Sequence, residues 1–160
     1  MRVQEVMTIM PETCTIDDSA ADAARIMWQR DCGAVPVVDR DGRIAGMVTD
    51  RDICMGAYFN GTPLSLIQVS NIMCDDLCTC EADDDVRDAE RLMRDRQIRR
   101  LPVVDERRTV VGILSLSDVA QSLKPNGRSV EANEGRDFLE TVAAVSQPRG
   151  PRGQAASGSA

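Results

Sequence analysis

The sequence predicts a mixed α/β (α+β) protein built from two β-α-β-β-α repeats that pack together about a pseudo-twofold axis. The first observation is an internal duplication: residues 6–53 align with residues 72–119 without a gap, and sixteen of the 48 aligned positions are identical. The second is that β-branched runs and helical periodicity alternate in the same order within each copy. The third is length, because each copy in this chain of 160 residues is too short to bury a good core alone.

Each copy begins with a short β-strand that leads into a helix. The strands are expected at 13–16 and 78–81, and the helices at about 20–30 and 86–96, where Ala, Met and Leu recur at helical spacing. Acidic and hydroxyl side chains precede each helix and can accept hydrogen bonds from its first free amides. The candidates for the N-cap are Ser19 or Asp18 in the first copy and Asp84 or Asp85 in the second.

Two β-branched runs and a second helix complete each copy. The first run is VPVVD or LPVVD, and the second is IAGMV or VVGIL, with turns expected at 41–42 and 107–108. The segments TDRDICMGAY and SLSDVAQSL then predict helices, with Thr49 and Ser115 at or near the first turn. This order mixes parallel and antiparallel pairing, which indicates an α/β or α+β fold and excludes an all-α one.

Composition divides the chain into four parts. Gly61 and Pro63 interrupt regular structure between the copies, and a Gly-, Ser-, Ala-, Pro- and Arg-rich end predicts a disordered C-terminal tail. A short helix is expected before the tail, at about 137–146, with one apolar face formed by Phe138, Leu139, Val142 and Val145. The expected parts are repeat 1 at 2–58, a linker at 59–69, repeat 2 at 70–123 and a C-terminal extension at 124–160.

Composition also excludes several classes of function. Asp and Glu outnumber Lys and Arg by 26 to 19, the net charge is −7, and aromatic residues make up only 2%, so nucleic acid is not an expected partner. The chain has no histidine, no P-loop lysine motif and no nucleophile paired with a base, so it is not expected to be an enzyme. With no long apolar run and no signal-peptide pattern, we expect a cytoplasmic protein that does not bind membranes.

The six cysteines favour no disulfide framework in a cytoplasmic protein. Cys74, Cys78 and Cys80 form a C-x3-C-x-C cluster that lacks a histidine and a second CxxC pair, so no metal site is predicted. The simpler interpretation is that the cysteines act as small buried apolar residues, with one or two of their thiols exposed. A redox or metal sensor that uses these three cysteines is kept as an alternative.

A duplicated motif, G-x-x-[ST]-x-x-D, carries the strongest chemical signal. It runs from Gly46 through Thr49 to Asp52, and the second copy contains Ser115 and Asp118 at the same spacing. At a strand-to-helix junction the hydroxyl would lie at the helix N-terminus, which favours anions, and the carboxylate could accept both hydroxyls of a ribose. Plain N-capping is the preferred explanation for a single copy, and duplication favours the ligand site only somewhat, because it also copies structural features.

In combination these motifs resemble a tandem pair of cystathionine β-synthase (CBS) domains, called a Bateman module. The resemblance rests on VMT at 6–8 and IMC at 72–74, on the VPVVD and LPVVD runs, and on GMVTDRDI and GILSLSDV; it covers about residues 2–123. It implies a regulatory module that binds adenosine-type ligands in clefts between the repeats and forms homodimers. The implied ligands are AMP, ADP, ATP, S-adenosylmethionine or NAD(H).

The resemblance also implies roles for individual residues. Asp52 and Asp118 match ribose-binding acids, Thr49 and Ser115 match hydroxyls at the same helix starts, and Thr15 matches a threonine of the first strand. The strand entries that would line the base pocket are Ala34, Val35 and Pro36 in repeat 1 and Arg100, Leu101 and Pro102 in repeat 2.

The two implied sites differ in charge. Arg51 is placed for a phosphate but its counterpart is Ser117, and Arg99 with Arg100 forms a basic pair that repeat 1 lacks. Glu81 stands where repeat 1 has Thr15 and would repel a phosphate. At most one tight site is therefore expected. A solvated surface or a salt bridge to Asp95 or Glu106 would equally explain the arginines.

The sequence therefore predicts a non-catalytic sensor of an adenosine-type ligand, with no firmly expected cofactor beyond an adenine nucleotide as regulatory ligand. Its output would act in trans on a protein target. Two alternatives remain: a structural or dimerisation protein with vestigial clefts, and the cysteine-based sensor.

Overall fold

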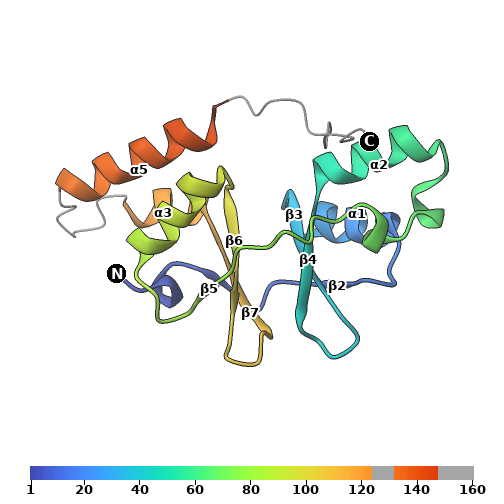
Figure 1. Ribbon diagram of the computed structural model, residues 1–160, viewed down its shortest axis with the longest axis horizontal. Helices are drawn as coiled ribbons and strands as arrows, with labels where there is room; N and C mark the ends of the chain where they lie inside the picture. Colours follow the sequence, from blue (N-terminus) through green and yellow to red (C-terminus); the bar gives the residue numbers. More distant parts are fainter. Residues whose placement is uncertain (124–131, 148–160) are drawn as a thin grey trace, which may run out of the picture.

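The computed structural model describes residues 1–123 and 132–147, and it contains one sheet for each repeat with helices packed on the outer sides (Figure 1). Repeat 1 consists of β2 (Cys14–Thr15), α1 (Ala20–Gln29), β3 (Ala34–Val38), β4 (Ile44–Thr49) and α2 (Asp50–Asn60). Repeat 2 consists of β5 (Cys80–Glu81), α3 (Val86–Arg96), β6 (Arg100–Val104), β7 (Val110–Ser115) and α4 (Leu116–Ser122). The remaining elements are β1 (Thr8–Ile9), the 3-10 helices η1 (Val3–Glu5), η2 (Leu64–Leu66) and η3 (Val69–Asn71), and α5 (Ala132–Val145).

Both sheets have the pairing that the sequence predicts. In repeat 1, β2 is parallel to β3 and β3 is antiparallel to β4, with Ala34 opposite Thr49. In repeat 2, β5 is parallel to β6 and β6 is antiparallel to β7, with Arg100 opposite Ser115. Each antiparallel pair shifts register at the equivalent position near its end. The mixed α+β class is confirmed.

The pseudo-twofold axis is visible in the contacts between the repeats. Thr8 of β1 pairs with Ile113 of β7. At the aligned positions of the other repeats, Cys74 pairs with Met47 of β4. The bridge between Arg2 and Asp85 is matched in the same way by the bridge between Ser19 and Gln68. Since these contacts have counterparts at the aligned positions, the expected twofold arrangement is confirmed.

The segment that leads into each repeat packs into the core of the other. Val3 is fully buried in the core of repeat 2, together with Val86 and Leu101. Val69 is fully buried in the core of repeat 1. This exchange explains why two copies that are each too short for a good core can stabilise one another.

Hydroxyl and carboxyl side chains start the helices as the sequence predicts. Ser19 is the N-cap of α1 and Asp85 is the N-cap of α3, which decides between the two candidates in each copy. Thr49 and Ser115 cap α2 and α4 in the same way, each within a capping box. These caps place the aspartate of each G-x-x-[ST]-x-x-D motif in the first turn of its helix.

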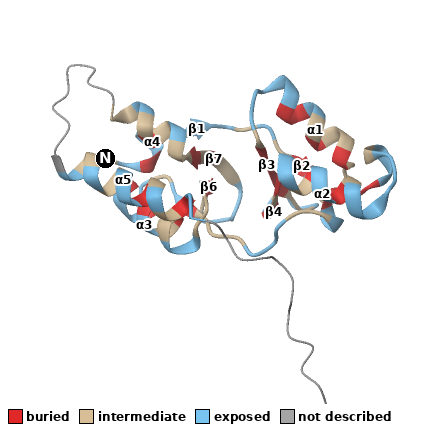
Figure 2. Cartoon of the chain, turned by 90° about the horizontal axis from the view of Figure 1, so that it is seen from above, coloured by how far each residue is buried: buried red, intermediate tan, exposed pale blue. Residues whose placement is uncertain are grey.

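The C-terminal helix α5 is longer than the expected 137–146 and covers the helices of repeat 2 (Figures 1 and 2). Its inner face contains Phe138, Thr141 and Val145, whereas Leu139 is 68% exposed, so its predicted place on the apolar face is wrong. The position of Leu139 one step after Phe138 turns it about 100° round the helix, to the solvent side. The expected disordered tail lies outside the described residues.

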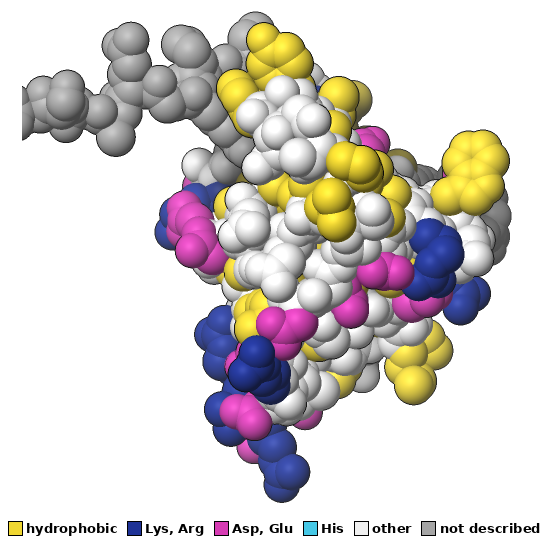
Figure 3. Space-filling view, turned by 90° about the vertical axis from the view of Figure 1, so that its right-hand side faces the viewer, with side chains coloured by type: hydrophobic (Ala, Val, Ile, Leu, Met, Phe, Trp, Pro, Cys, Tyr) yellow, Lys and Arg dark blue, Asp and Glu magenta, His cyan; other side chains and the backbone are white. Residues whose placement is uncertain are grey.

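The corresponding helices of repeat 1 have no such cover among the described residues. Trp28 on α1 is 89% exposed, and Tyr58 and Phe59 on α2 are also exposed. Figure 3 views this end of the molecule and shows hydrophobic side chains on its surface. Within the described part of the chain, none of the helices has the length and apolar character needed to cross a bilayer.

Candidate ligand site

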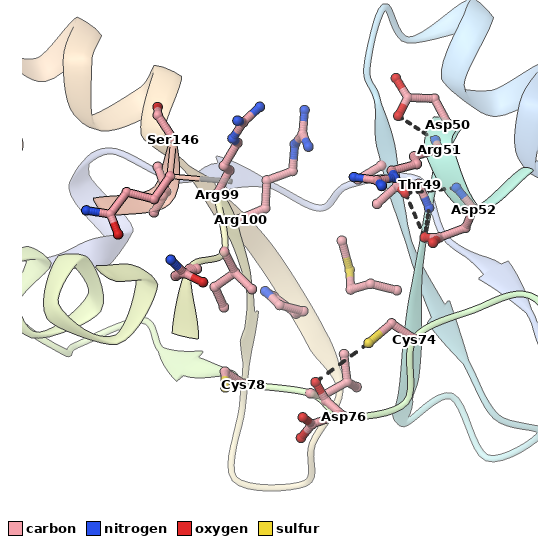
Figure 4. A pocket seen from close by; sticks show the side chains of 18 residues that line it. Thr49, Asp50, Arg51, Asp52, Cys74, Asp76, Cys78, Arg99, Arg100 and Ser146 are labelled. Atoms are coloured by element: carbon pink, nitrogen blue, oxygen red, sulfur yellow. Dashed lines mark hydrogen bonds between the residues drawn. The ribbon is translucent and has the colours of Figure 1, made fainter. Parts of the chain in front are cut away.

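A cavity of about 620 Å³ lies at the seam between the repeats (Figure 4). Its walls come from the β4–α2 junction of repeat 1, the segment 74–78, the start of β6 in repeat 2, and the end of α5. A cavity of this size is within the range that holds drug-sized ligands. The lining residues are Ala34, Met47, Thr49, Asp50, Arg51, Asp52, Cys74, Asp76, Leu77, Cys78, Gln97, Ile98, Arg99, Arg100, Pro102, Val145, Ser146 and Gln147.

The helix start of repeat 1 contributes a hydroxyl and a carboxylate. The Thr49 hydroxyl donates to Asp52 Oδ2 at 2.6 Å, and the Thr49 amide donates to the same oxygen at 3.0 Å. The Asp52 amide in turn donates to Thr49 Oγ1 at 3.2 Å. Because the cap uses Oδ2, the second carboxylate oxygen of Asp52 is the one that can accept hydrogen bonds from a ligand, and no described residue donates to it.

Three guanidinium groups approach the cavity from both repeats. Arg51 comes from α2, Arg99 immediately precedes β6, and Arg100 is the first residue of β6 (Figure 4). Among residues 1–123 and 132–147, none of the three belongs to an ion pair, so the salt bridges considered for Arg99 and Arg100 with Asp95 or Glu106 do not form. Unpaired guanidinium groups are suited to bind a phosphate or carboxylate in bidentate fashion.

The cavity also contains acidic side chains, and one of them lies near the arginines: the Asp50 carboxylate and the Arg100 guanidinium both approach Gly33. Asp50 Oδ1 accepts a hydrogen bond from the Arg51 amide at 2.7 Å, so this acid is engaged at its own helix start. Asp76 belongs to the segment 74–78, which lies on the opposite side of the view from Arg99 and Arg100 (Figure 4). The arrangement places the three guanidinium groups in one part of the cavity, with the Asp50 and Asp52 carboxylates of the α2 start beside them.

Seven of the thirteen sequence-predicted site residues line this cavity, and six do not. Val35 and Leu101 are buried in the cores of their own repeats, because neighbouring residues of a strand point to opposite faces. Pro36 is buried without lining the cavity, and Thr15 is exposed on β2. Ser115 and Asp118 form their capping box elsewhere. The seven that line it are Ala34, Thr49, Arg51, Asp52, Arg99, Arg100 and Pro102.

Sequence reasoning missed eleven lining residues. The alternation of β4 puts Met47 on the same face as Thr49, and this signal could have been used. The segment 74–78 lines the cavity because the leading segment of repeat 2 packs against repeat 1. Gln97 and Ile98 line it because α3 ends beside it. Residues 145–147 come from outside the repeats, so no motif pointed to them.

Comparison with known proteins identifies the family. The model of the CBS domain matches residues 3–56 and 69–125. The chain belongs to the CBS domain family. The predicted recognition of a tandem CBS pair is thereby confirmed, and the two matched segments correspond to the two structural repeats.

Relatives and solved structures agree with this assignment. The CBS domain-containing protein YhcV of Bacillus subtilis (strain 168) is 36% identical over 124 residues, which are 78% of this chain and 86% of that protein. The CBS domain pair of protein MJ0100 in complex with 5′-methylthioadenosine and S-adenosyl-L-methionine has a TM-score of 0.69 at 27% identity and covers 76% of this chain and 94% of that chain. The structure of Hypoxic Response Protein I with two coordinated zinc ions also gives 0.69, at 26% identity, and covers 77% and 99%.

The three clustered cysteines of this CBS pair lie in different surroundings. Cys80 is buried in the core of repeat 2, and burial, together with the negative charge of Asp84, raises the pKa of its thiol to about 12. A thiol with this pKa stays protonated and is a poor nucleophile and metal ligand. Cys74 and Cys78 line the cavity. The described residues contain no group of three or more cysteine, aspartate or glutamate side chains that could hold a metal ion.

Proposed function

We propose that this CBS pair is a non-catalytic sensor that binds an adenine nucleotide in the seam cavity. In this proposal Asp52 accepts the ribose hydroxyls, Ala34 and Pro102 contact the base, and Arg51, Arg99 and Arg100 bind the phosphates. The observation that carries the proposal is one cavity at the seam that contains both the first-turn carboxylate and three arginines that form no ion pair with any described residue. Support also comes from the MJ0100 pair, which was solved with two adenosine-type ligands.

The charges favour phosphorylated ligands over the other adenosine compounds that the family resemblance implies. S-adenosylmethionine has a positive sulfonium centre and offers no phosphate to the three arginines. AMP, ADP and ATP carry oxygens that guanidinium groups bind bidentately, and each charge-assisted hydrogen bond contributes about 1.5–3 kcal/mol. We therefore propose an adenine mono-, di- or triphosphate as the ligand.

The output belongs to the same proposal. A bound nucleotide would change the surface that a cytoplasmic protein target recognises in trans, and two modules would associate as a homodimer. The exposed aromatic residues of α1 and α2, including Trp28 and the Tyr58–Phe59 pair, support a contact surface on repeat 1. A dimerisation protein with vestigial clefts is the alternative, and it predicts the same surface without nucleotide binding.

Calorimetric titration with AMP, ADP, ATP, S-adenosylmethionine and NADH tests the proposal. We expect a micromolar dissociation constant for at least one adenine phosphate and weaker binding of S-adenosylmethionine. Asp52→Ala should lower the affinity at least tenfold. Asp118→Ala is the matched control, because it removes an equivalent capping carboxylate that does not line the cavity, and it should change the affinity less than twofold. Absence of binding by all five compounds would refute the nucleotide sensor and leave the dimerisation protein and the cysteine-based sensor.

A further inference from the structure

The end of α5 forms one wall of the seam cavity although it lies outside both CBS repeats. Val145, Ser146 and Gln147 all line the cavity. The last two are held by the helix, because the Ser146 amide donates to Val142 O at 3.1 Å and the Gln147 amide donates to Ala144 O at 3.3 Å. The position of this wall therefore depends on how α5 sits on repeat 2.

Gln97 of repeat 2 also links the cavity to the attachment of α5. Gln97 lines the cavity, and its side-chain amide donates to Ala144 O at 3.4 Å. It ends α3 in the left-handed conformation, with φ of 52°. Farther along the interface Arg94 of α3 approaches Glu140 of α5 at 3.7 Å. Any ligand that contacts Gln97 or residues 145–147 also acts on the contact between α3 and α5.

The same interface contains a feature that opposes docking. Glu90 of α3 is only 5% exposed, and its Oε1 has no hydrogen-bond partner within residues 1–123 and 132–147. Burial and the charges of Asp137 and Glu134 on α5 raise its pKa to about 7, against the opposing effect of Arg94 and Arg87 on α3. Repeat 1 has Ala24 at the aligned position. A buried carboxyl without a partner is costly, so α5 is held with less free energy than its apolar contacts alone would supply.

We propose that α5 is part of the ligand site, and that nucleotide binding strengthens the docking of α5 on repeat 2. The inference rests on the proposed function and adds how nucleotide binding in the cavity is transmitted to the surface of repeat 2. A nucleotide bound by Arg99 and Arg100 lies against residues 145–147 and makes contacts that exist only while α5 is docked. Because coupling between two equilibria is reciprocal, docked α5 raises the nucleotide affinity by the same factor by which bound nucleotide favours docking, so a change that undocks α5 weakens binding by up to that factor. Release of α5 exposes Phe138 and Val145, and with them the helical face of repeat 2, as the signal to a partner.

Hydrogen exchange of the full-length protein measures this coupling directly. Amides of residues 138–147 should exchange at least threefold more slowly with saturating AMP or ATP than without nucleotide. Amides of α1, which lies away from the cavity, should change less than 1.5-fold. Binding without any change in α5 exchange would overturn the inference while leaving the nucleotide sensor intact, whereas absence of binding refutes both.

Two variants test the reciprocal effect. Phe138→Ala removes an apolar contact between α5 and repeat 2 and should lower nucleotide affinity three- to tenfold. Leu139→Ala, at the exposed neighbouring position, is the matched control and should leave the affinity unchanged. If Phe138→Ala does not fold, Glu90→Gln provides the opposite test: it removes the opposing charge and should raise the affinity at pH 8 about two- to fivefold. Equal affinities in wild type, Phe138→Ala and Glu90→Gln would overturn the inference.

Discussion

The two repeats build the same helix start and place it in different surroundings. Thr49 and Asp52 form a capping box whose three hydrogen bonds recur at Ser115 and Asp118 with distances that agree within about 0.2 Å. Only the capping box of Thr49 and Asp52 lines the cavity that contains three arginines and the end of α5. The comparison teaches that a duplicated motif guarantees a duplicated local structure, whereas ligand binding depends on what the rest of the chain places beside it.

The largest expected effect sharpens this difference by reversing a charge in the cavity. Arg99→Glu should lower the affinity for AMP or ATP at least a hundredfold, because it replaces a charge-assisted phosphate contact with repulsion. Arg107→Glu is the control, since Arg107 lies on the distant β6–β7 turn and outside the cavity. Isothermal titration at fixed ionic strength measures both affinities. Equal losses in the two variants would mean that the effect comes from net charge alone.

The second prediction concerns the difference between Glu90 and its counterpart Ala24. Burial raises the pKa of Glu90 from 4.5 to about 7, so the folded protein keeps a proton that the unfolded chain releases. The free energy of unfolding should therefore fall as pH rises through this interval, and the protonated carboxyl is the stabilising form. Glu90→Gln should remove much of this dependence and raise stability at pH 8 by about 1 kcal/mol.

Urea unfolding of the wild type and of Glu90→Gln at pH 5 and pH 8 measures how the free energy of unfolding depends on the Glu90 carboxyl. Arg91→Gln is a suitable control, because it changes an exposed charge on the same helix without touching the interface with α5. If wild type and Glu90→Gln keep the same stability difference at both pH values, the carboxyl does not titrate in this range and the prediction is wrong.

The smallest effect tests the part of the comparison that should be symmetric. Thr49→Ala and Ser115→Ala each remove one N-cap and should each lower the free energy of unfolding by about 1 kcal/mol. Thermal melting of the two variants provides the measurement. With nucleotide present, Thr49→Ala should also show a smaller rise in melting temperature, because its hydroxyl holds Asp52 in the cavity. If the two substitutions lower the free energy of unfolding by amounts that differ by more than about 1 kcal/mol without nucleotide, the two N-caps are not equivalent.

Much of the fold could be predicted from sequence because its signals are local or duplicated. The caps at Ser19, Thr49 and Ser115 follow from hydrogen bonds within three residues. The exchange of leading segments could not be seen, because Val3 is joined by sequence to the repeat whose core it does not enter. In the site, the family resemblance and the unequal charge of the aligned repeats predict Arg51, Arg99 and Arg100, whereas residues 145–147 lie outside both repeats and could not be predicted in this way.

The sequence by itself determined the duplicated β-α-β-β-α order, the helix starts, and the inequality of charge between Arg99–Arg100 and Gly33–Ala34. These depend on side chains a few residues apart or on direct comparison of aligned positions. Only the tertiary structure decided that Asp52 lines the seam cavity while Asp118 does not, and that α5 closes one side of it. These features depend on packing between segments far apart in the chain, and such packing produces no local sequence pattern.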